Sequence, residues 1–87
     1  MKLPPIVEIE WVDACSGSGW RTKEETANWI KDEPRYFAVG YLISKTKREI
    51  TIATGTVPKM EKTHDLFQVP TAWVKKIRTI RRAEKVG

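Results

Sequence analysis

The sequence predicts a small, mainly β domain of about five antiparallel strands, with one short α-helix inserted after the first strand. Two observations support this fold class. Apolar side chains alternate with polar ones in several segments, and turn-forming residues separate these segments. One stretch, residues 22–31, instead has the capping residues and composition of a helix. The 87 residues suffice for one domain with a thin core, and we expect 1–5 and 83–87 to be frayed ends of a single domain spanning 1–87.

Residues 6–12 are the first predicted strand. Val7, Ile9 and Trp11 alternate with acidic residues, which is typical of an antiparallel strand with one buried face. The next segment, 13–19, contains two glycines and two serines and is predicted to be a loop.

The helix is predicted from a capping-box spacing. Thr22 and Glu25 lie three positions apart, so that the threonine caps the first turn and the glutamate reaches back to it. The helix is expected over 23–31, with Ala27 and Ile30 directed inward, and the proline that follows prevents it from continuing further.

A β-hairpin is predicted next. Residues 36–43 form its first strand, 44–47 its polar turn and 48–54 its returning strand, in which Ile50 and Ile52 are expected to face inward. The apolar residues that share one face of the first strand are Phe37, Val39, Tyr41 and Ile43. Gly40, in the middle of this strand, indicates a bulge or the close approach of another element.

The C-terminal part is open to two interpretations. Residues 59–65 are predicted to be a polar connection, and 66–69 a short strand. Apolar residues then recur at a helical spacing from Trp73, which would suit an amphipathic helix capped by Thr71. The alternative is a single helical turn at 71–73 that leads into a strand over 74–81.

The stretch 69–77, Val-Pro-Thr-Ala-Trp-Val-Lys-Lys-Ile, resembles the end of SH3 domains. There a 3₁₀ turn precedes the last strand, so the resemblance favours the second interpretation. Together with the order of the predicted elements, it implies an SH3-like barrel. The Ala-Leu-Tyr-Asp-Tyr stretch and the tryptophan pair of SH3 peptide-binding grooves are missing from the sequence, so the resemblance does not imply binding of proline-rich peptides.

The wider chain is similar to small bacteriophage and prophage proteins with no assigned function. The matching residues are Trp11, Asp13, Gly19, Trp20, Val39, Gly40, Tyr41, Leu42, Val69 and Pro70. This similarity implies a phage-encoded protein located in the cytoplasm of the host cell, and it implies no activity. The single cysteine and the missing signal peptide also favour a reducing cytoplasm.

Two groups of residues are candidates for binding. Residues 71–87 hold six basic side chains against one acidic, which accounts for the net charge of +5 of the whole chain. Such a cluster suits the phosphates of DNA or RNA, and it also suits a solvated tail. The candidate nucleic-acid-binding residues are Lys75, Lys76, Arg78, Arg81, Arg82 and Lys85.

The second group is predicted to bind protein and consists of Trp20, Arg21 and Trp29. Trp20 lies among glycine, serine and arginine, a composition typical of an interface anchor. In the alternative interpretation, Trp20 folds back and plugs one end of the barrel.

Catalytic chemistry is not predicted. His64 is the one histidine and Cys15 the one cysteine, too few for a structural zinc site. A dyad of Cys15 and His64, completed by Asp13, would require distant segments to meet. We therefore expect a non-enzymatic module without metal or cofactor that acts on a host or phage protein, or alternatively on nucleic acid. Self-association through unpaired barrel edges is a further possibility, and no membrane partner is expected.

Overall fold

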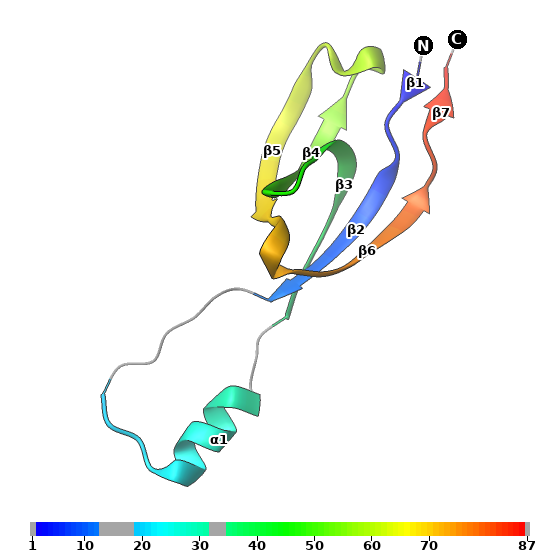
Figure 1. Ribbon diagram of the computed structural model, residues 1–87. Helices are drawn as coiled ribbons and strands as arrows, with labels where there is room; N and C mark the ends of the chain where they lie inside the picture. Colours follow the sequence, from blue (N-terminus) through cyan, green and yellow to red (C-terminus); the bar gives the residue numbers. More distant parts are fainter. Residues whose placement is uncertain (1, 13–18, 32–34, 87) are drawn as a thin grey trace.

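The computed structural model describes residues 2–12, 19–31 and 35–86, except for the side chains of 29–31. The described residues form a mainly β fold with one short helix (Figure 1). The elements in chain order are β1 (Lys2–Leu3), β2 (Ile6–Val12), α1 (Lys23–Lys31), β3 (Arg35–Lys45), β4 (Glu49–Thr56), the 3₁₀ turn η1 (Pro58–Met60), β5 (Thr63–Pro70), the 3₁₀ turn η2 (Thr71–Trp73), β6 (Val74–Arg81) and β7 (Glu84–Lys85).

Five strands make one antiparallel sheet in the order β5-β4-β3-β2-β6. A second, two-stranded sheet joins β1 to β7. Within the described residues, β5 and β6 do not pair with each other, so each is an edge of the larger sheet.

The core shows that this sheet is strongly bent. Ile9 of β2 and Ile50 of β4 are both fully buried in one cluster, although β3 lies between their strands. Two side chains two strands apart can pack together only if the sheet curves around them. The buried cluster as a whole consists of Val7, Ile9, Trp11, Ile50, Ile52 and Val69.

β3 and β4 approach each other closely at Gly40. A Cβ atom there would lie 2.7 Å from the carbonyl oxygen of Ala53 and 3.2 Å from the Cβ of Ile52, so β3 and β4 are closer here than a side chain allows. The sequence prediction of a close approach at this glycine is confirmed. The pairing of β3 with β4 begins at Tyr41 and shifts register between Leu42 and Ser44.

The structure decides between the two interpretations of the C-terminal part. Residues 71–73 form a 3₁₀ turn and 74–81 a strand, so the amphipathic helix is wrong. Thr71 fixes the turn against the β3–β4 hairpin. Its N–H donates to the carbonyl of Arg48 at 2.9 Å, and its hydroxyl donates to the carbonyl of Thr46 at 3.0 Å.

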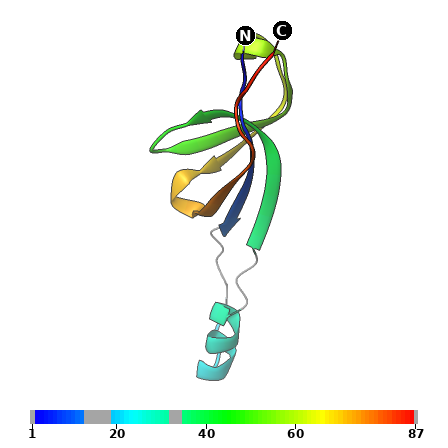
Figure 2. The same ribbon diagram turned by 90° about the vertical axis from the view of Figure 1, so that its right-hand side faces the viewer.

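Strands occupy parts of three segments that were predicted to be irregular. Part of the predicted polar connection 59–65 belongs to β5, which starts at Thr63 because β4 extends to Thr56 and pairs with it. The predicted frayed ends are paired as well, Lys2 with Lys85 in β1 and β7. These short strands continue the neighbouring strands β2 and β6, whose ends lie side by side (Figures 1 and 2).

The structure shows which face of β3 packs on the core, and it corrects one expectation about the helix. Ala38 and Leu42 pack against the core, whereas Phe37 and Val39 on the opposite side of β3 are 58% and 52% exposed. The helix spans Lys23–Lys31 as predicted, but Ala27 is exposed and not directed inward. The reason is that α1 stands apart from the sheet, beyond the end of β2 and the start of β3, in a molecule that measures 61 × 20 × 19 Å (Figures 1 and 2).

We expect Gly40→Ala to destabilise the fold by about 1–3 kcal/mol, because the added methyl group would overlap the Ala53 carbonyl. Gly55→Ala is the matched control. A Cβ at position 55 would lie 3.5 Å from the Cβ of His64, an ordinary contact, so this change should be neutral or slightly stabilising. Thermal unfolding of both variants is the measurement. Equal melting temperatures would show that the close approach does not constrain the sheet.

Candidate functional site

Four aromatic side chains from four different elements line a groove at one end of the core. They are Trp11 of β2, Tyr36 of β3, Phe67 of β5 and Trp73 of η2. The lining is completed by residues 68–70, and the groove encloses about 340 Å³. We call it the aromatic groove. The described residues that line it include no charged side chain.

Trp11 is the floor of the aromatic groove. Its ring stacks on that of Tyr36, with centroids 5.7 Å apart and planes at 25°, and it contacts Phe67 at 5.4 Å and 48°. The first contact follows from register, because Trp11 and Tyr36 are directly opposite in the β2–β3 pairing. Trp11 itself is 9% exposed, whereas Tyr36 and Phe67 are each 43% exposed. The groove can therefore offer two partly free rings to a ligand, held in place by a buried one.

The sequence did not identify the aromatic groove. Tyr36, Phe67 and Trp73 are far apart in the chain, and their proximity depends on strand register, which composition and spacing do not give. The Pro-Thr-Ala-Trp stretch predicted the turn that holds Trp73 but not which side chains would surround it.

Trp20, a predicted protein-binding residue, is fully exposed. The interpretation in which it plugs the end of a barrel is therefore wrong. It precedes α1, whose predicted capping is confirmed: the N–H of Glu25 donates to Oγ1 of Thr22 at 3.1 Å, and that hydroxyl lies 3.1 Å from the Glu25 carboxylate. Arg21 is exposed too, while the side chain of Trp29 lies outside the described residues.

The candidate nucleic-acid-binding residues do not form a uniform basic face. On the outer side of β6, Arg78 lies 3.7 Å from the carboxylate of Glu8. Lys76 is opposite Glu10 in the β2–β6 pairing, and Glu10 in turn contacts Arg35 at 2.6 Å. Carboxylates of β2 thus lie between the cations and offset their charge.

Further along β6, Arg81 is also engaged. Its guanidinium lies 3.1 Å from the Glu84 carboxylate and 5.8 Å from the centre of the Tyr41 ring. The remaining candidates, Lys75, Arg82 and Lys85, are exposed. The positively charged surface that these residues offer to a phosphate backbone is therefore discontinuous.

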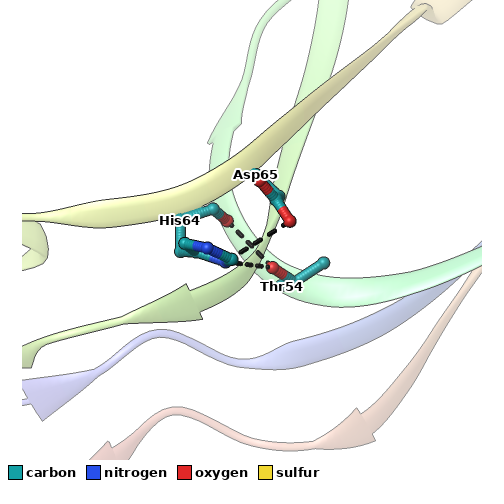
Figure 3. Close-up of polar contacts among 3 residues, drawn as sticks. All are labelled: Thr54, His64 and Asp65. Atoms are coloured by element: carbon teal, nitrogen blue, oxygen red, sulfur yellow. Dashed lines mark hydrogen bonds and ion pairs between the residues drawn. The ribbon is translucent and has the colours of Figure 1, made fainter.

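Thr54, His64 and Asp65 form a polar cluster (Figure 3). The Thr54 hydroxyl lies 3.0 Å from Nδ1 of His64, and the Asp65 carboxylate lies 3.4 Å from the same nitrogen. A nucleophile–base–acid triad needs its histidine to contact the two partners through different nitrogens. This cluster therefore has the residue types of a triad without its geometry.

Other predicted chemistry involves residues that the structure does not describe. Cys15, Asp13 and most of the glycine-serine loop lie outside the described residues. Within 2–12, 19–31 and 35–86, no three His, Cys, Asp or Glu side chains gather as a metal site. The described residues also contain no helix that is long and apolar enough to cross a bilayer.

Comparison with family models, with curated proteins and with solved structures gives no match. Function has to be argued from the residues of the chain itself.

We expect Trp20→Ala to leave folding stability within about 0.5 kcal/mol of the wild type, since the indole makes no buried contact. Trp11→Ala is the contrasting variant and should cost about 3–5 kcal/mol, because it removes the buried floor of the aromatic groove. Chemical denaturation of the two variants measures the difference. A comparable loss of stability in both would mean that Trp20 belongs to the core.

Proposed function

We propose that this chain is a non-enzymatic protein-binding module built on an SH3-like barrel, and that its aromatic groove is the main contact surface. The observation that supports this proposal is the exposure of Tyr36 and Phe67 around the buried ring of Trp11. Aromatic side chains offer a large apolar area at a small cost in conformational entropy, and they are enriched among the residues that dominate protein interfaces.

The barrel part of the proposal is supported by topology. A bent five-stranded sheet in the order β5-β4-β3-β2-β6, with a 3₁₀ turn between β5 and β6, agrees with the element order that the SH3 resemblance implied. The aromatic groove lies next to that 3₁₀ turn, which contributes Trp73. The similarity to phage proteins makes a bacterial or phage protein in the host cell the expected partner.

Trp20 is a second proposed contact. It lies on the part of the chain that stands off the sheet, and an indole left fully in water gives up the stabilisation that burial would supply. Such exposure is understandable if a partner covers the ring. Together with Arg21, it retains the composition of an interface anchor.

Nucleic acid is the alternative partner, and the charge arrangement does not favour it. Binding to a phosphate backbone is driven by cations that replace condensed counterions. Here Arg78 and Arg81 already contact carboxylates.

The protein-binding proposal predicts that Tyr36→Thr weakens partner binding by about tenfold or more, because it removes an exposed ring from the aromatic groove. Trp20→Ala should weaken the same complex independently. Ile80→Thr is the control, since Ile80 is an exposed apolar side chain on β6, outside the groove. The immobilised chain is used to retain a partner from bacterial lysate, and the affinity of the purified complex is then measured. Undiminished retention by both aromatic variants would contradict the proposal.

For nucleic acid, we expect no binding of labelled DNA or RNA at physiological salt in fluorescence anisotropy. Tight binding that weakens steeply with salt, and that is lost when Arg81, Arg82 and Lys85 are all changed to Gln, would instead establish the basic residues as the site.

A further inference from the structure

The first half of β3 has an open edge. In the described residues, β3 pairs with β2 over 35–41, but its pairing with β4 begins only at Tyr41. Beyond Ala53, β4 continues to pair with β5 on one side, but no described strand pairs with it on the side that faces β3. From Gly40 toward Arg35, β3 and β4 therefore diverge.

The open edge presents specific backbone groups. The N–H of Leu42 donates to the carbonyl of Pro5 at 2.9 Å, on the β2 side of β3. Because the N–H and C=O groups of successive strand residues point to opposite sides, those of Ala38 and Gly40 point to β2 as well. The groups of Phe37 and Val39 consequently point away from β2, into the space between β3 and β4.

That space is a hollow of about 340 Å³, which we call the strand recess. It is lined mainly by Phe37, Ala38, Val39, Ile52, Asp65 and Phe67. It also shares Trp11 and Phe67 with the aromatic groove, so the two hollows are neighbours.

The two outer edges of the sheet are protected against pairing, whereas this inner edge is not. Exposed edge strands normally contain charges, kinks or prolines that prevent added strands. On β6 the charges are Lys75, Lys76 and Arg78. On β5 the interruption is Asp65, whose φ of 50° is unusual for a strand residue. The stretch 36–40 of β3, Tyr-Phe-Ala-Val-Gly, contains no charge and no proline.

We propose that the strand recess binds an extended segment of a partner protein, which adds to the edge of β3 by bonding to the backbone of Phe37 and Val39. Its inward side chains are apolar and enter the hollow above Ala38 and Ile52. A basic residue of the segment meets Asp65, the charged member of the recess lining, whose side chain is 70% exposed. This inference deepens the proposed function and rests on it, since it takes the partner to be a protein.

A single extended segment fits the recess better than a second copy of this chain does. The open edge lies between β3 on one side and β4 and β5 on the other. A second copy presenting its own β3 would bring its own β4 and β5 into the same narrow space. A second copy presenting β6 would bring several cations, Lys75, Lys76 and Arg78, to a described lining in which Asp65 is the one carboxylate.

Amide hydrogen exchange followed by NMR gives the first test. In the free protein, the amides of Phe37 and Val39 should exchange at least about tenfold faster than those of Ala38 and Gly40, which bond to β2. The probe is a short peptide of alternating valine and threonine with one terminal arginine. Its addition should slow exchange at Phe37 and Val39 in particular. Unchanged exchange at these two amides at saturating peptide would overturn the inference.

Variants make the test specific for backbone pairing. Val39→Pro removes an amide that points into the recess and none that points to β2, so we expect about tenfold weaker peptide binding. Val39→Ala keeps the amide and shortens only the side chain, so it should lose clearly less affinity than Val39→Pro does. Asp65→Asn keeps a residue type that tolerates the φ of 50° and should weaken binding of the arginine peptide but not of a glutamine analogue. Equal affinities of Val39→Pro and Val39→Ala would exclude strand addition.

Two further comparisons separate failure of the strand recess from failure of the proposed function. If Val39→Pro does not fold, peptides methylated on alternate backbone nitrogens replace it. Methylation on the edge that faces β3 should abolish binding, and methylation on the other edge should not; equal effects would overturn the inference. If binding is lost in Tyr36→Thr but not in Val39→Pro, the aromatic groove alone is the site. In that case the proposed function stands and the strand recess is excluded.

Discussion

At Gly40 the backbone of β3 passes so close to the carbonyl of Ala53 that no methyl group fits between them. The arrangement of β3 and β4 differs in the two directions along the strands from this contact. Toward the hairpin turn, β3 and β4 pair and bring Ile50 and Ile52 over the side chains of β2. Toward Arg35, the two strands separate and leave the strand recess. The close approach at Gly40 therefore lies between the paired part of the two strands and the opening beside it.

Core and candidate site share residues. Trp11 is a member of the buried cluster, and it also lines both the aromatic groove and the strand recess. A small domain has few buried side chains, so one large ring can serve in stabilisation and in shaping a surface at once. Phe67 also contributes to both core and surface, since it contacts Trp11 and remains partly exposed. Changes at the exposed rings are thus more informative about binding than changes at Trp11.

Local signals in the sequence were sufficient for the elements that depend on local contacts. The helix follows from the Thr22–Glu25 capping pair. For the turn before β6, the residues left two interpretations open, and the resemblance of the stretch around Thr71 to SH3 domains favoured the one that the structure has. Long-range features were not accessible. The exposure of Ala27 depends on α1 not packing on the sheet, and the groove depends on the register that places Tyr36 opposite Trp11. The ion pairs of Glu8 and Glu10, which offset the basic residues of β6, likewise result from strand pairing.

The pairing of Lys2–Leu3 with Glu84–Lys85 places both ends of the described chain side by side, at the end of the molecule opposite α1 (Figure 1). Mechanical tension that pulls these two ends apart would act across the antiparallel neighbours, perpendicular to the direction of their strands. Their hydrogen bonds would then break one after another, from β1 and β7 into β2 and β6, and would not resist as a group. Tension applied at this end would therefore separate the strands progressively, and it would reach Trp20, at the opposite end of the molecule, last.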